Sequence, residues 1–107
     1  MVIWDGNAVN SADVPSGNAE GFCAIADVLG ANQALAPSPS NPLDGLPEVI
    51  VVANSNVYIL NGQDGTVQRD IDPSESIRGG PPNVDDFDGD GFPEFGTAYG
   101  AAYVMFD

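Results

Sequence analysis

Short apolar runs separated by turn residues set the pattern of this chain. Residues 48–53 contain Val-Ile-Val-Val, a continuous β-branched run typical of a strand buried on both faces. Turns rich in asparagine and glycine separate this run from the next two apolar segments, which predicts successive hairpins. The predicted strands are residues 2–5, 22–27, 48–53, 57–61, 66–71, 82–86, 94–99 and 102–107. No segment shows a helical period of useful length, so the predicted fold class is all-β.

Residues 30–47 interrupt this succession of strands. Prolines occupy positions 37, 39, 42 and 47 among alanine, serine and asparagine. Proline lacks an amide hydrogen and clashes with the preceding helical turn, so prolines at this density exclude a helix. We therefore expect an irregular Pro-rich insertion at 30–47.

The second half of the chain repeats the first. Residues 44–48 (Asp-Gly-Leu-Pro-Glu) are identical at four of five positions to residues 90–94 (Asp-Gly-Phe-Pro-Glu). Both copies then continue without a gap, so that Asn61 falls on Asp107, 46 residues later. A repeat of this length with about four short strands is typical of a propeller blade. The expected architecture is therefore about two four-stranded antiparallel blades of a β-propeller.

The repeat divides the chain into three parts. Residues 1–20 form the tail of a preceding blade and a linker, residues 21–72 a complete blade with the insertion, and residues 73–107 a partial second blade. One blade cannot bury both of its faces, and stable repeat arrays generally need about three units or more. We therefore expect a piece of a larger propeller, or a subunit that must associate to complete one.

The charge of the chain narrows its partners. Sixteen acidic residues and two arginines give a formal net charge of −14. Such a surface repels phosphate backbones and anionic lipids, which argues against nucleic-acid and membrane-surface binding. No apolar run approaches the roughly 20 residues of a spanning helix, so membrane insertion is not expected either. The remaining cations, Arg69 and Arg78, are expected to pair with nearby acids.

The chain also lacks the residues of most hydrolase chemistry. It has no histidine, and Cys23 is its single cysteine. A cysteine nucleophile needs a base, and a thiolate metal site needs further ligands. Cys23 lies in an apolar run, so we expect a small buried hydrophobe there. No set of acid, base and nucleophile stands out, and the chain is not expected to be an enzyme.

Residues 86–94, Asp-Phe-Asp-Gly-Asp-Gly-Phe-Pro-Glu, carry the clearest candidate chemistry. Carboxylates occupy the first, third, fifth and ninth positions, with glycine at the fourth and sixth. Acids spaced in this way on a turning loop can converge on a hard divalent cation, which needs about six to eight oxygens. The helix–loop–helix calcium pattern requires glutamate at the twelfth position, which is Thr97 here, so the loop is of a shorter kind. The alternatives are a solvated acidic loop and an Asx-type turn without an ion.

These residues resemble a known family. Residues 79–107, and more weakly 21–107, are similar to the FG-GAP/VCBS repeats of integrin alpha-subunit propellers and many bacterial extracellular proteins. The family's calcium motif is Asp-x-Asp-x-Asp-Gly-x-x-Asp. The resemblance implies Ca²⁺ bound between the first two strands of a blade. The ligands that it implies are the side chains of Asp86, Asp88, Asp90 and Glu94 and the carbonyl of Phe92. This chain departs from the family in having Gly79-Gly80 where the family has Phe-Gly.

The first copy of the repeat offers a second possible metal site. Asp27, Asp44 and Glu48 take the places of Asp86, Asp90 and Glu94, but 13 extra residues intervene between the outer pair. Nothing clear replaces Asp88, although Asn41 or a backbone carbonyl is a candidate. The alternative is that residues 44–48 are retained only as a turn and the start of a strand.

The expected function is that of a calcium-binding structural or adhesive propeller segment in an extracellular or cell-surface protein. Expected partners are other blades of the same protein or neighbouring subunits, and an extracellular protein or glycan. One alternative is a carbohydrate-binding, lectin-like propeller, because the chain contains Trp4, Tyr58, Tyr99 and Tyr103. We favour packing between blades for these aromatic residues. Further alternatives are an ancillary domain of a secreted enzyme and a self-assembling surface or filament subunit.

Overall fold

The computed structural model describes residues 21–53, 55–74, 79–100 and 102–107. These residues form β1 (Gly21–Ala26), β2 (Glu48–Ala53), β3 (Asn56–Leu60), β4 (Val67–Ile71), β5 (Asn83–Asp85), β6 (Glu94–Tyr99) and β7 (Ala102–Phe106). Every strand predicted from residue 22 onward is confirmed, with ends displaced by at most one residue. The predicted strand at 2–5, with the rest of residues 1–20, lies outside the described residues.

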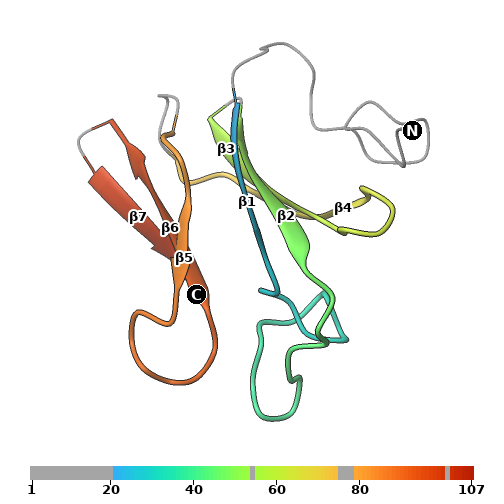
Figure 1. Cartoon of the computed structure of the whole chain (residues 1–107). Helices are drawn as coiled ribbons and strands as arrows, with labels where there is room; N and C mark the ends of the chain where they lie inside the picture. Colours follow the sequence, from blue (N-terminus) through green and yellow to red (C-terminus); the bar gives the residue numbers. More distant parts are fainter. Residues whose placement is uncertain (1–20, 54, 75–78, 101) are drawn as a thin grey trace.

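The strands form two antiparallel sheets that stand side by side (Figure 1). The first sheet has the order β1-β2-β3-β4, and the second sheet has the order β5-β6-β7. Within each sheet every strand pairs with its neighbour in sequence, as expected for successive antiparallel connections. The described part of the chain is thus all-β, as predicted. No helix long and apolar enough to cross a membrane occurs in it.

The repeat found in the sequence recurs in the strand register. Each pair between β2 and β3 has its counterpart 46 residues later between β6 and β7. Ile50 pairs with Ile59, for example, and Gly96 pairs with Met105. The pairings of β1 with β2 and of β5 with β6 also correspond. The two sheets are therefore two copies of one structural unit.

Equivalent faces of the two sheets point in the same direction. Ile50 of the first sheet is buried in the core between the sheets. Its counterpart Gly96 lies between Phe95 and Thr97, and Phe95 belongs to that core. Because neighbouring residues of a strand face opposite sides, Gly96 lies on the far face of the second sheet. The sheets thus stack head to tail, and not with equivalent faces together.

An apolar core fills the space between the two sheets. Its buried members are Val28, Leu29, Ile50, Val52, Val57, Ile59, Phe95 and Tyr99. The Phe95 ring also stacks on Phe106, with centroids 4.9 Å apart. Gly79 borders this core, where a Cβ atom would lie 2.5 Å from Val52 Cγ1 and 2.7 Å from Tyr99 Cζ. No side chain fits at position 79, which is the physical reason for glycine there.

The Pro-rich insertion is irregular, as predicted. It contains two isolated bridges, Gly30–Leu43 and Ser38–Asn41, and no regular strand. The buried Asn41 amide organises it, because Asn41 Oδ1 accepts the Asn32 N–H at 3.0 Å and Asn41 Nδ2 donates to the Asn32 carbonyl at 3.0 Å. A side chain that uses both ends of its amide in this way fixes the loop without help from a strand ladder.

Two side-chain predictions are wrong. Cys23 is exposed, because the alternation of β1 places Cys23 and Ile25 on the face opposite the core. Arg69 has no described carboxylate within 4.0 Å, although pairing with an acid was expected. Arg78 lies outside the described residues.

The aromatic residues considered for sugar binding differ in their burial. Tyr99 is completely buried between the sheets and Tyr58 is buried in the first sheet, in keeping with a packing role. Tyr103 is half-exposed, and its hydroxyl oxygen accepts a hydrogen bond from Asn83 Nδ2 at 3.2 Å. Trp4 lies outside the described residues.

Candidate metal centres

The loop between β5 and β6 holds its carboxylates with its own amides. The Gly91 N–H donates to Asp86 Oδ2 at 3.0 Å. The Asp90 N–H donates to Asp88 Oδ1 at 3.0 Å. The Phe92 N–H donates to Asp90 Oδ1 at 2.8 Å. These bonds turn consecutive acids toward one point, which a straight strand would not do.

Glycine is required at the bend of this loop. Gly91 has a φ of +93° and Gly89 a φ of +83°, a left-handed backbone that residues with a Cβ rarely adopt. A Cβ at Gly91 would meet no atom within 4 Å. Conformation, and not space, therefore selects glycine at this position.

Glu94 closes the loop from the start of β6. It is buried, and its Oε2 atom accepts the Phe87 N–H at 2.7 Å. This bond crosses the loop and ties the beginning of the loop to the following strand. One carboxylate oxygen of Glu94 therefore fixes the loop, and the other oxygen can bind a metal ion.

The four acids of this loop come together as predicted. Asp86, Asp88, Asp90 and Glu94 each offer an oxygen, and these four atoms lie within 4.8 Å of one another. We call this group the second-sheet cluster. Charges this close repel by about 1 kcal/mol per pair even in water, so a cation at their centre would relieve the strain. The cluster can hold a metal ion.

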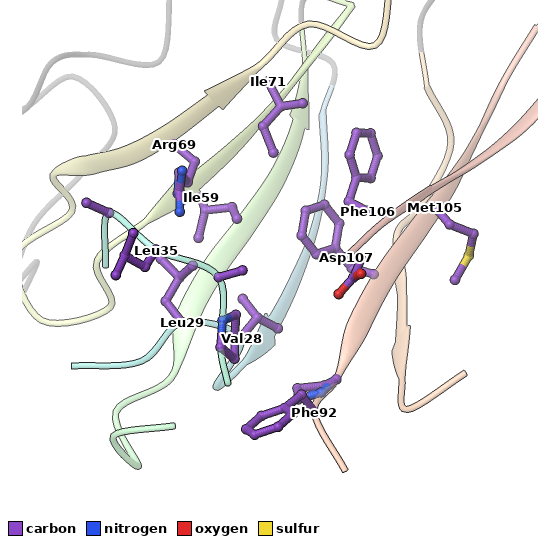
Figure 2. Close-up of a pocket in the computed structure, with 15 residues that line it drawn as sticks. Val28, Leu29, Leu35, Ile59, Arg69, Ile71, Phe92, Met105, Phe106 and Asp107 are labelled. Atoms are coloured by element: carbon purple, nitrogen blue, oxygen red, sulfur yellow. The ribbon is translucent and has the colours of Figure 1, made fainter. Parts of the chain in front are cut away.

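The remaining predicted ligand in this loop, the Phe92 carbonyl, stays a prediction. The Phe92 N–H is bound to Asp90 Oδ1, and the Phe92 ring points into the cavity between the sheets (Figure 2). Asp85 is not a member of the second-sheet cluster, and its Oδ1 accepts the Asp86 N–H at 2.9 Å.

The loop between β1 and β2 reproduces this geometry in spite of its insertion. Asp27, Asp44 and Glu48 each offer an oxygen, and these atoms also lie within 4.8 Å of one another. We call them the first-sheet cluster. The two loops that carry these clusters, between β1 and β2 and between β5 and β6, lie at the same end of the two sheets, at the bottom of Figure 1.

Three hydrogen bonds are equivalent in the two loops. Glu48 Oε2 accepts the Val28 N–H at 2.9 Å, as Glu94 Oε2 accepts that of Phe87. Asp27 Oδ2 accepts the Gly45 N–H at 2.8 Å, as Asp86 Oδ2 accepts that of Gly91. Asp44 Oδ1 accepts the Leu46 N–H at 2.8 Å, as Asp90 Oδ1 accepts that of Phe92. Gly45 also shares the positive φ of Gly91. Residues that align in the two loop sequences therefore also occupy equivalent positions in the structure.

Glu48 is the most deeply buried acid of the first-sheet cluster, with 1% of its surface exposed. Burial raises the pKa of Glu48, and the charges of Asp27 and Asp44 raise it further. Hydrogen bonds from the Val28 and Leu29 amides oppose this shift and favour the ionised form. The net shift is upward, so the ionised form of Glu48 is disfavoured unless a positive charge lies close to the cluster.

Asp27 supplies an independent sign of an absent ligand. Its Oδ1 atom is buried and has no hydrogen-bond partner in the described part of the chain, whereas Oδ2 accepts the Gly45 N–H. A buried polar atom without a partner is rare, because it loses its bonds to water and gains nothing in return. A cation among Asp27, Asp44 and Glu48 would satisfy it.

The first-sheet cluster has three acids, because no residue replaces Asp88. Asn41, a candidate from the sequence, does not serve, since its amide is engaged with the backbone of the insertion. Sequence reasoning missed this role of Asn41 and also the use of Glu48 as an acceptor. The available signal for Glu48 was its fixed spacing from Asp44, equal to that of Glu94 from Asp90.

Both clusters offer oxygen donors only, and no described nitrogen or sulfur atom joins them. Oxygen ligands of this kind select hard cations such as Ca²⁺ and Mg²⁺ over zinc or copper. Comparison of the chain with protein-family models, with curated proteins and with solved structures found no match.

Proposed function

We propose that this chain is a calcium-binding structural or adhesive segment of a β-propeller of the FG-GAP/VCBS type. In this role the second-sheet cluster binds Ca²⁺, and the ion ties β5 to β6 at one end of the blade. The role is non-catalytic. A propeller that depends on such loops fits an extracellular or cell-surface protein, because calcium sites of extracellular modules work at about 10⁻⁴ to 10⁻³ M.

The observation that carries the proposal is the hydrogen-bond pattern shared by the two acidic loops. The two loops differ in length by 13 residues, yet they retain the same three amide–carboxylate bonds and the same left-handed glycine. A turn without an ion has no need to keep four acids within 4.8 Å of one another. Shared ion binding accounts for both features.

The stacking of the sheets supports the propeller assignment. Blades of a propeller are repeats arranged around an axis, so each presents the same face to the next. The two sheets here stack in that sense, with Ile50 in the interface and its counterpart Gly96 on the outer face. A sandwich of two sheets related by a two-fold axis would place equivalent residues together.

The first-sheet cluster is proposed as a second, weaker calcium site. It has one carboxylate fewer than the second-sheet cluster, and affinity falls with the number of charged ligands. The unpartnered Asp27 Oδ1 is the observation that favours an ion there over a simple turn.

Calorimetric titration with Ca²⁺ and thermal unfolding with and without chelator test this function. Calcium at about 100 times its dissociation constant adds about 2.7 kcal/mol of stability, which corresponds to roughly 10 °C or more in Tm for a chain of this size. Asp88→Asn keeps an acceptor for the Asp90 N–H but removes one charge, so it should weaken binding at the second-sheet cluster alone.

The matched control is Asp64→Asn. Asp64 is an exposed acid whose Oδ1 also accepts backbone and side-chain bonds, from Thr66, but it belongs to neither cluster. Asp64→Asn should remove one negative charge, as Asp88→Asn does, and leave calcium binding unchanged. A Tm that does not respond to chelator, or equal calcium affinity in Asp88→Asn and wild type, would refute the proposal.

A further inference from the structure

Phe92 lies where the acidic loop between β5 and β6 meets the first half of the molecule. Every residue from 85 to 91 is exposed, whereas Phe92 is partly buried. Its ring points into the cavity of about 580 Å³ between the two sheets, and Val28 and Leu29, which follow β1, line the same cavity (Figure 2). Val28 and Leu29 belong to the buried core. The exposed part of the loop is therefore followed directly by a side chain that reaches across to the core.

Phe92 is also joined to the second-sheet cluster through its backbone. Its N–H donates to Asp90 Oδ1 at 2.8 Å, and Asp90 is one of the four acids that offer an oxygen there. A displacement of Phe92 would disturb the hydrogen bond that orients this acid. The main chain of Phe92 thus contacts the cluster, while its side chain occupies the space between the sheets.

The repeat shows that the turn itself does not require this apolar contact. Leu46 is the counterpart of Phe92, and its N–H makes the equivalent bond to Asp44 Oδ1 at 2.8 Å. The Leu46 side chain is nevertheless 44% exposed and does not line the cavity. This difference is expected when equivalent faces of the two sheets point in the same direction. Packing between the sheets, and not the turn, therefore accounts for the burial of Phe92.

We propose that Phe92 couples the ion at the second-sheet cluster to the packing of the two sheets, an inference that rests on the calcium binding proposed above. With the cluster filled, the loop is ordered and the Phe92 ring is held in the cavity. With the cluster empty, the exposed loop moves more freely and the ring packs less firmly. The coupling is reciprocal, because a contact that orders the loop in advance reduces the entropy lost when the ion binds. The Phe92 side chain thereby raises calcium affinity although it supplies no ligand atom.

Calorimetric titration of side-chain truncations tests this coupling. Phe92→Ala keeps the backbone N–H and carbonyl, and it should lower calcium affinity at the second-sheet cluster by roughly fivefold or more. Phe92→Leu retains an apolar side chain and should recover part of that loss. Phe87→Ala is the matched control, since Phe87 belongs to the same loop but is 49% exposed and does not line the cavity. The control should bind calcium as the wild type does.

Methyl NMR spectroscopy in a Glu48→Gln background measures the effect in the opposite direction. This background weakens binding at the first-sheet cluster, so that calcium acts through the second-sheet cluster. Calcium should then change the resonances of the Val28 and Leu29 methyl groups. Adding Phe92→Ala should abolish most of that change, whereas adding Phe87→Ala should preserve it.

Two results would overturn the coupling while calcium binding itself stands. One is equal calcium affinity in Phe92→Ala and Phe87→Ala, and the other is a set of Val28 methyl resonances that ignore calcium in the Glu48→Gln background. If Phe92→Ala does not fold, Phe92→Leu and Phe87→Leu provide the same comparison. Absence of calcium binding in the wild type would instead refute the proposed function, and the coupling with it.

Discussion

Glu48 and Glu94 occupy the same position in two differently connected loops. Each is the first residue of its strand, each is buried, and each accepts with Oε2 the amide that follows the first aspartate of its loop. The loops that lead to them differ by 13 residues. The end of the loop is therefore fixed by these contacts, and the connection between is free to vary.

Glutamine at either position should separate structure from ion binding. Glu94→Gln keeps an oxygen for the Phe87 N–H but removes a charged ligand, so calcium affinity at the second-sheet cluster should fall roughly tenfold or more. Glu48→Gln should act in the same way at the first-sheet cluster alone. Calorimetric stoichiometry is the measurement. Two ions bound with wild-type affinity in both variants would contradict the assignment of ligands.

Alanine at Gly91 should destabilise the loop through its backbone. A φ of +93° costs a residue with a Cβ about 1–2 kcal/mol, and no neighbour would be displaced. Denaturant unfolding in chelator measures this cost without the contribution of an ion. Gly80→Ala is the control, because its Cβ would meet only ordinary contacts at 3.8 Å and 3.9 Å. Equal stability of the two variants would show that the bend is not strained.

Phenylalanine at Tyr99 should stabilise the fold by about 1 kcal/mol. The Tyr99 hydroxyl is buried without a hydrogen-bond partner among the described residues, and its removal relieves an unpaired polar atom. Tyr103→Phe provides the contrast, since it removes the exposed hydroxyl that bonds to Asn83. It should leave stability unchanged or slightly lower it. Chemical denaturation of both variants decides the matter, and a loss of stability in Tyr99→Phe would reveal a partner for the hydroxyl.

Alkaline pH should lower the free energy of unfolding, because two buried tyrosines resist ionisation in the folded chain. Burial raises the pKa of Tyr99 above its ordinary value of 10.0, with a smaller contribution from Tyr58. Burial, followed by the charge of Asp70, likewise raises the pKa of Tyr58. The folded chain therefore holds these protons more tightly than the unfolded chain. Stability is fully present below about pH 10 and is lost as the pH rises through the higher folded pKa.

Unfolding free energies measured between about pH 9 and pH 11 test this dependence. The fall should be smaller in Tyr99→Phe than in wild type. An identical pH profile in the variant and the wild type would show that the pKa of Tyr99 is the same in the folded and the unfolded chain.

The strands and the second-sheet cluster were predictable because both depend on local pattern. The run in β2 and the hairpin turns fix strand positions through alternation, and the spacing of Asp86, Asp88 and Asp90 reports a turning loop. The repeat extended this inference to Glu48. These features need only neighbours in sequence, or a comparison of the chain with itself.

The remaining features depend on contacts between distant segments. Cys23 lies in an apolar run, yet the apolar run does not say which face of β1 meets the second sheet. Arg69 and the cavity it lines arise from the spacing of two sheets, which no local pattern encodes. The role of Asn41 likewise requires the folded path of the insertion.

The bridge between Gly30 and Leu43 closes the insertion at its base, while Leu35 near its middle forms part of the cavity wall. The carboxylates of Asp27 and Asp44 lie outside that closed base. Length and composition within the insertion can therefore change without moving either acid, yet each change reshapes one wall of the cavity. The chain thus combines a hydrogen-bonded frame of two sheets with one surface loop whose path is independent of the acidic clusters, the arrangement that allows immune-receptor domains to vary what they recognise on a constant scaffold.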